Sequence, residues 1–282
     1  MKTVHFEQSL KAKLRVIAKE KNCDPADLWQ HLMVERFLVR LARSDYHDRF
    51  VLKGATLLSK YVDIGRETKD IDMLACRMSN DVEDIKTVFE SVAKIDLKDG
   101  FVFRDVEAQV LFHPHMSYHG TKASMIVYFG KTKFKVEVDV GFGDIVEPVM
   151  YSLPLTTYSK GPLFEDSVHL LCYPKEFIFA EKLETIVYRG ELNSRMKDFH
   201  DVYSLIQFFT NDPCSKIEET IQSVFAHRGT PLSVPIIYVN DNLEVFWKRY
   251  INALQHKERN KLPKSIKEVV KVINDWLGQY EF

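Results

Sequence analysis

The stretch VLKGATLLSKYVDIGRETKDIDMLA, residues 51–75, decides how the rest of the chain is interpreted. Near its end, Asp70 and Asp72 lie on either side of Ile71 in an apolar run. Side chains alternate between the two faces of a strand, so a strand over residues 69–75 places both carboxylates on one face. Two like charges placed in this way repel each other unless a cation lies between them. The pattern therefore indicates either a half-exposed strand with solvated acids or a site for a divalent cation.

The residues before the aspartates favour the cation site. Lys53-Gly54-Ala55-Thr56 follows the apolar Phe50-Val51-Leu52 and opens a short helix expected over residues 53–62. A glycine turn at a helix N-terminus presents free backbone N–H groups and the positive end of the helix dipole to an anion. An isolated D-x-D is more typical of solvated acids. A phosphate-binding turn followed by paired aspartates is more informative than either feature alone.

A third carboxylate is expected on a neighbouring strand. Residues 101–112, 123–129 and 133–140 form a strand-rich block with turn signals at His119-Gly120 and Gly130-Lys131. In KFKVEVDV, residues 133–140, the valines share one face and the charged residues, including Asp139, share the other. Ligands that are all oxygen suit Mg²⁺, which keeps part of its coordination shell for water and substrate phosphate. Asp70, Asp72 and Asp139 are therefore the predicted metal ligands.

The chain is predicted to be α+β, with a mixed sheet in a first lobe and helices in a second. Helical patterns precede the sheet at residues 7–21 and from Asp24-Pro25 onward, which are a good N-cap and first helical residue. A further helix is expected over 81–94. The character then changes, with helices expected over 174–189, 195–209, 215–226, 241–256 and 263–280. We expect a first lobe over residues 1–165 and a helical lobe over residues 166–282.

Composition excludes several other classes of protein. The 282 residues are 45% apolar and 28% charged with a net charge of −1, which is ordinary for a soluble globular protein, so any nucleic-acid-binding surface must be local. The four cysteines are widely scattered and form no CxxC pair, so neither a zinc ribbon nor a disulfide framework is indicated. No signal-peptide core or membrane span is visible, and we expect a cytoplasmic location.

A second charged cluster lies in YPKEFIFAEKLETIVYRGELNSRMKDFHDVYSLI, residues 173–206. Lys182 and Arg189 are two helical turns apart and project from the same side of a helix. Arg195 and Asp198, and then Asp198 and Asp201, are three residues apart and also share a side. Taken alone, the cluster is more typical of an exposed helix pair with ordinary ion pairs.

Both stretches resemble the signatures of the AbiEii/MenT-type toxins, which belong to the DNA polymerase β-like nucleotidyltransferase superfamily. The quoted FVLKGATLL and GRETKDIDMLA resemble its Gly-Gly or Gly-Ser turn and D-x-D, and the second cluster resembles its Lys-Leu helix and R-x-K-D-x-x-D. The likeness covers roughly residues 30–210. It departs at Ala55, where the family has Gly or Ser. If a serine hydroxyl contacts phosphate in relatives, this chain can make that contact only through Thr56 or the backbone.

The resemblance implies roles for individual residues. It implies that Asp70, Asp72, Lys182 and Asp198 are catalytic and that Lys182 contacts the nucleotide triphosphate. The helical lobe would then complete the NTP site. Together with the turn, the predicted nucleotide-binding residues are Gly54, Ala55, Thr56, Arg66, Lys182 and Arg195. Arg189 and Asp201 are expected to hold the helices together.

The resemblance also implies an activity and partners. The implied reaction is Mg²⁺-dependent transfer of a nucleoside monophosphate from an NTP, with the 3′ end of tRNA as the implied acceptor. Extending that end would block charging and stop translation, which makes the protein a toxin of a bacterial toxin–antitoxin or abortive-infection system with a cognate antitoxin. Two alternatives stay open. One is NTP-dependent modification of a protein, AMPylation-like or by a kinase reaction, and the other is an inactive protein that binds nucleotide or RNA.

Two further features are less specific. His113, His115 and His119 lie close together, but no cysteine or acidic partner is near, and a solvent-facing hairpin is expected rather than a zinc site. The stretch 248–271 has eight Lys or Arg against two Glu. It suits either a surface that follows a phosphate backbone or a solvated helix face.

Overall fold

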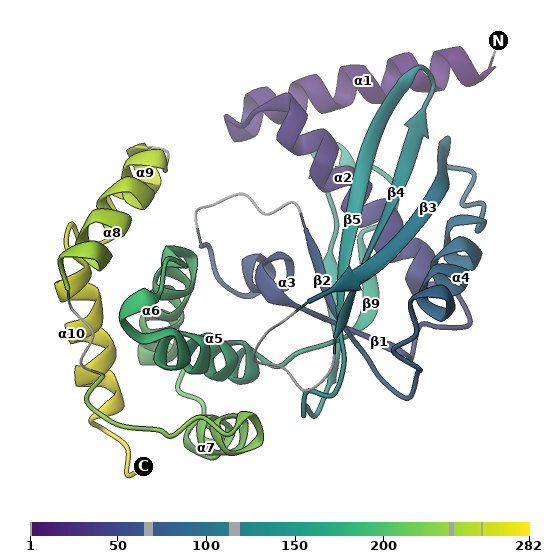
Figure 1. Cartoon of the computed structure of the whole chain (residues 1–282). Helices are drawn as coiled ribbons and strands as arrows, with labels where there is room; N and C mark the ends of the chain where they lie inside the picture. The colour runs from purple at the N-terminus through teal and green to yellow at the C-terminus, as the bar shows by residue number, and fades with distance from the viewer. Residues whose placement is uncertain (1, 65–69, 113–118, 237–239, 255) are drawn as a thin grey trace. The chain divides into compact units, whose positions relative to one another are not determined.

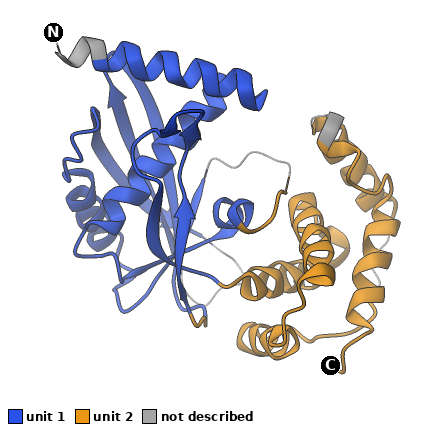
Figure 2. Ribbon diagram, turned by 180° about the vertical axis from the view of Figure 1, so that it is seen from behind, with its two compact units in different colours: residues 1–60, 67–144, 148–173 blue, residues 61–66, 145–147, 174–282 orange. Residues whose placement is uncertain are grey.

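The structure is a computed structural model of the whole chain, which divides into two compact units (Figure 2). It describes all residues except 1, 65–69, 113–118, 237–239 and 255, and the side chains of 2–5, 256 and 257. Unit 1 comprises residues 1–60, 67–144 and 148–173, and unit 2 comprises residues 61–66, 145–147 and 174–282. The boundary at 165/166 between a first lobe and a helical lobe that completes the NTP site stays a prediction.

Unit 1 is built on a sheet of seven strands in the order β3-β4-β5-β2-β1-β9-β6 (Figure 1). β2 pairs with β5, and β1 with β9, in parallel, and the other neighbours are antiparallel, so the sheet is mixed as predicted. A small second sheet joins β7 and β8. The strands are β1 Phe50–Lys53, β2 Ile71–Ala75, β3 Phe101–Leu111, β4 Gly120–Phe129, β5 Thr132–Gly141, β6 Val149–Pro154, β7 Thr157–Tyr158, β8 Gly161–Pro162 and β9 Ser167–Cys172.

Helices α2 and α4 cover one face of this sheet (Figure 1). The alternation along β4 and β5 follows from this cover. Side chains such as Met125 and Val138 on the covered face are fully buried, while Lys122 and Asp139 on the other face are partly exposed. The helices described in this unit are α1 Lys2–Lys21, α2 Pro25–Ala42, α3 Gly54–Tyr61 and α4 Val82–Ala93. The carboxylate of Asp24 caps α2 as predicted, accepting a hydrogen bond from Ala26 N at 2.7 Å.

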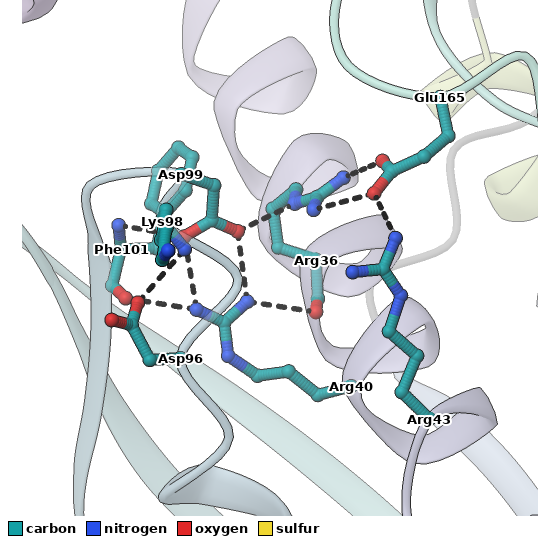
Figure 3. A network of polar contacts seen from close by, with 8 residues as sticks. All are labelled: Arg36, Arg40, Arg43, Asp96, Lys98, Asp99, Phe101 and Glu165. Carbon is teal, nitrogen blue, oxygen red and sulfur yellow. Dashed lines mark hydrogen bonds and ion pairs between the residues drawn. The ribbon is translucent and has the colours of Figure 1, made fainter.

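Helix α2 is more deeply buried than its periodicity predicts, because a charge network replaces part of its polar face (Figure 3). Arg36 and Arg40 are each 1% exposed. Arg40 donates to both carboxylate oxygens of Asp99 at 2.9 and 3.0 Å, and Arg36 Nε donates to the same group at 2.8 Å. Arg36 and Arg43 also bind Glu165. The network ties α2 to the segments that precede β3 and β9.

Unit 2 is helical apart from short connecting segments. Its core lies between α5, α6, α7 and α10, where Phe179, Phe209 and Trp276 pack ring against ring. The described helices are α5 Lys175–Arg189, the 3₁₀ turn η1 Gly190–Leu192, α6 Met196–Asn211, α7 Ile217–Arg228, α8 Asp241–Ala253, α9 His256–Arg259 and α10 Ile266–Leu277. The five helices predicted for this part of the chain are confirmed, and α9 adds one turn after α8.

Candidate functional site

Four charged residues form one row across four neighbouring strands of unit 1. In the registered pairs, Lys53 of β1 lies opposite Asp72 of β2, Asp72 opposite Asp139 of β5, and Asp139 opposite Lys122 of β4. Residues that are paired in register project from the same face of a sheet. The predicted neighbouring strand for Asp139 is thus confirmed, and the two carboxylates lie between two lysines.

Asp72 lies against the turn that opens α3. Gly54 has a φ of +69°, and a Cβ built on it would lie 2.0 Å from Asp72 Oδ2. Only glycine accommodates both the left-handed backbone and so close a carboxylate. The turn and the D-x-D, which the sequence presents 16 residues apart from Gly54 to Asp70, therefore meet in space.

Asp70 lies one residue before β2 begins at Ile71, and its side chain is exposed. Its backbone carbonyl accepts a 2.7 Å hydrogen bond from the Thr56 hydroxyl, which fixes Asp70 to the first turn of α3. Thr56 is buried, and this hydrogen bond uses its hydroxyl proton. The threonine side chain therefore positions Asp70.

Asp139 is held in an environment that disfavours its charge. Burial raises the pKa of its carboxyl, Lys122 acts in the opposite direction, and the negative charges of Asp70 and Glu137 raise the pKa further, so that it lies above its ordinary value. Within the part of the chain that the structure describes, Asp139 Oδ1 is buried and accepts no hydrogen bond. Lys122 Nζ lies 3.5 Å from that oxygen as an ion pair.

The other end of the row is also anchored. Lys53 Nζ donates to Asp144 Oδ2 at 2.6 Å, and it lies 3.4 Å from the hydroxyl of Tyr173 and 4.9 Å from the centroid of its ring. The side chains of Lys53 and Asp144 are 17% and 5% exposed. This anchor fixes the residue immediately before the Gly54 turn.

In unit 2, the second predicted cluster converges on Lys182. Its Nζ lies 3.0 Å from Asp198 Oδ1 and 2.8 Å from Asp201 Oδ2, which joins α5 to α6. Burial raises the pKa of Asp198, but the nearby charges of Lys182 and Arg195 outweigh it, so the pKa lies below its ordinary value. Asp198 therefore stays ionised although its side chain is only 3% exposed.

The two remaining arginines of this cluster differ. Arg195 Nε donates to Asp198 Oδ2 at 2.7 Å, yet its side chain is 56% exposed and reaches solvent. Arg189 ends α5, and among the described residues its buried Nε has no hydrogen-bond partner. The sequence grouped these residues correctly, but it did not show that one lysine bridges both acids.

Several residues that the sequence analysis named lie outside the described residues, and several lysines of the basic stretch form ion pairs. Arg66, His113 and His115 lie outside the described residues. Of the basic residues in 248–271, Lys248 pairs with Glu244, Lys261 with Asp63 and Glu258, and Lys271 with Asp275. Within the described ranges, no group of three or more His, Cys, Asp or Glu forms a ready-made metal site. No described helix is long and apolar enough to cross a membrane.

Sequence reasoning missed both lysines at the ends of the row, but a signal for one of them was present. The two-residue turn Gly130-Lys131 sets Phe129 opposite Thr132, and counting back along the hairpin places Lys122 opposite Asp139. The pairing of Lys53 with Asp72 has no such local signal, because the connection between β1 and β2 includes a helix.

Comparison with known families gives one match over most of the chain. The family described as "Nucleotidyl transferase AbiEii toxin, Type IV TA system" matches residues 36–271. Comparison with curated proteins gives no match.

Solved structures with the same fold include two bacterial proteins. MenT4, a nucleotidyltransferase toxin from Mycobacterium tuberculosis H37Rv, superposes with a TM-score of 0.53 at 15% identity, covering 91% of this chain and 85% of that one. JHP933 from Helicobacter pylori superposes with a TM-score of 0.51 at 13% identity, covering 91% of this chain and 92% of that one. At these identities the likeness is one of fold.

Proposed function

The chain belongs to the AbiEii family of nucleotidyl transferase toxins of type IV toxin–antitoxin systems, and on that premise we propose that it transfers a nucleoside monophosphate from an NTP to the 3′ end of tRNA in a reaction that depends on Mg²⁺. The observation that carries the proposal is the close approach of Asp72 to Gly54, which brings the proposed phosphate-binding turn beside a pair of acids. A cognate antitoxin is the expected partner, and the cytoplasm is the expected site of action.

The two carboxylates of the row are of the kind that binds magnesium. Asp72 and Asp139 are paired in register, and Asp139 Oδ1 is a buried acceptor without a hydrogen bond among the described residues. Mg²⁺ commonly binds through one or two carboxylates together with substrate phosphates. We propose that Asp70, Asp72 and Asp139 hold it. When bound, the ion neutralises charge on the phosphates and on the attacking and leaving oxygens.

The chain's own residues supply binding and orientation. The backbone N–H groups of the α3 N-terminus offer a positive dipole end to the phosphates beside Asp72. Lys182 and Arg195 are proposed to bind the triphosphate. Asp198 forms ion pairs with both side chains and holds them in position. Positioning and charge neutralisation account for most of the acceleration in reactions of this kind.

In the proposed step, one bond to the α-phosphorus forms and another breaks. The acceptor 3′-oxygen forms a bond to the α-phosphorus, and the bond between that phosphorus and the oxygen bridging to the β-phosphate breaks. Pyrophosphate leaves with that electron pair. The hydroxyl proton passes to solvent or to a nearby base. The product is an RNA longer by one nucleotide, which presents a changed end to an aminoacylating enzyme.

Labelled nucleotides test this proposal and separate it from the alternatives. The full chain is incubated with tRNA, Mg²⁺ and each of the four NTPs, labelled at the α or the γ position. Label from the α position on RNA, lost in D72N and retained in D105N, is the expected result. Asp105 is a matched control because it is an exposed aspartate of the same sheet, bonded to Tyr128. Label on protein, or from the γ position alone, overturns the proposal in favour of protein modification or a kinase, and no transfer indicates an inactive binding protein.

A further inference from the structure

Lys122 contacts both a candidate metal ligand and a second carboxylate. Its ammonium lies 3.5 Å from Asp139 Oδ1 and 3.4 Å from Glu137 Oε2. Both acids lie on β5 two residues apart, so they project from the same face. The Lys122 side chain is 27% exposed and lies between the two acids at the end of the row.

Glu137 gives Lys122 a partner that does not depend on Asp139. Glu137 also pairs with Lys135 at 2.7 Å, so its carboxylate lies between two ammonium groups. An ammonium that leaves Asp139 therefore keeps a salt bridge, and the sheet keeps its charge balance. Lys135 is 55% exposed and pairs with Glu137, so it provides an internal comparison on the same face of the sheet.

We propose that Lys122 is a tethered counter-ion that occupies Asp139 when the divalent cation is absent and shifts to Glu137 when the cation binds. This inference rests on the proposed metal site. Lys122 is in this view a positioning residue, which sets how tightly the acids take up a metal and keeps Asp139 oriented before the metal arrives. It does not contact the reacting atoms.

The physical reason is competition for one carboxylate oxygen. A buried carboxylate without a cation is unfavourable, and a lysine nearby stabilises its charged form. The same positive charge opposes a divalent ion at that oxygen, and this interaction is strong because the site is partly shielded from water. Removing the charge should therefore tighten metal binding, although it removes a stabilising contact from the metal-free protein.

Binding of Mn²⁺ alone to the full chain, followed by electron paramagnetic resonance without nucleotide at pH 8, tests the inference. We expect K122M and K122Q to bind Mn²⁺ at least about tenfold more tightly than the unchanged chain, since one unit charge is removed close to a partly buried site. K122R keeps the charge and should stay within about twofold. K135M removes the same charge from the same face and should also stay within about twofold.

The role of Glu137 is tested by a double-mutant cycle. E137Q should weaken Mn²⁺ binding in the unchanged chain, because Lys122 is then left with Asp139, and it should have little effect when K122M is already present. Additive effects, an unchanged affinity in K122M, or an equal gain in K135M would overturn the inference. Mn²⁺ binding that D139N does not reduce, or no binding at all, would instead overturn the metal site of the proposed function and the inference with it.

Discussion

At residue 54, the absence of a side chain lets a carboxylate lie against the start of a helix. The Gly54 φ of +69° and the approach of Asp72 impose two separate requirements, one on the backbone and one on space. We predict that G54A lowers the rate of nucleotide transfer by at least about a hundredfold, because Asp72 must move and a displacement of about 1 Å can cost that much. Steady-state kinetics of transfer measure it.

Gly229 provides the control for backbone strain alone. It ends α7 with a φ of +65°, and a Cβ at this position meets nothing within 4 Å. G229A should therefore cost stability of about 1 kcal/mol without slowing transfer. If G229A reduced the transfer rate as much as G54A does, general destabilisation would explain both, and the role assigned to Gly54 would be wrong.

At the scale of elements, the buried network of α2 should dominate the stability of unit 1. Asp99 is 3% exposed and bonded to Arg36 and Arg40. We predict that D99N lowers the free energy of unfolding by about 3–5 kcal/mol at pH 7, because the buried guanidinium groups of Arg36 and Arg40 lose the negative charge that they share. Urea denaturation measures it. D48N is the control, since Asp48 pairs with Arg77 on the surface and should change stability by less than about 1 kcal/mol.

The same network should make the stability of the protein depend on pH. Burial raises the pKa of Asp99, but Arg40 and Arg36 outweigh it and place the pKa below its ordinary value. A carboxyl of this kind contributes stability that is present above its unfolded pKa and is lost as the pH falls through its folded pKa. The difference in stability between the unchanged chain and D99N should therefore shrink below about pH 4. A constant difference down to pH 2 would contradict it.

Elements with a strong period could be predicted from the sequence, whereas their long-range pairing could not. The alternation in β5 and the capped start of α2 were predicted from local chemistry. Strand β9 was missed, because its place beside β1 is decided by a parallel pairing of Leu52 with Cys172, 120 residues away. The interpretation of Asp70 and Asp72 depended on the same kind of information, since only the sheet register brings Asp139 beside them.

At the scale of the whole molecule, net charge limits how an RNA can bind. With a net charge of −1, the chain has no general attraction for phosphates, so an RNA surface must be a local excess of cations. Lys264 and Lys267 are exposed at the start of α10, where the helix dipole adds to their charge. We predict that K264Q/K267Q weakens tRNA binding and reduces the slope of log K against log salt by about 1 to 2, as expected for the loss of one or two phosphate contacts.

Filter binding of tRNA between low and moderate salt measures this slope. K94Q/K98Q removes the same number of charges from exposed positions around the end of α4 and is the matched control. Because both variants change the net charge equally, a purely global effect would alter both slopes to the same extent. A slope that changes only in K264Q/K267Q would assign the basic stretch 248–271 to phosphate binding. Equal slopes in the two variants would instead make that stretch a solvated helix face, with its lysines serving mainly ion pairs such as Lys271 with Asp275.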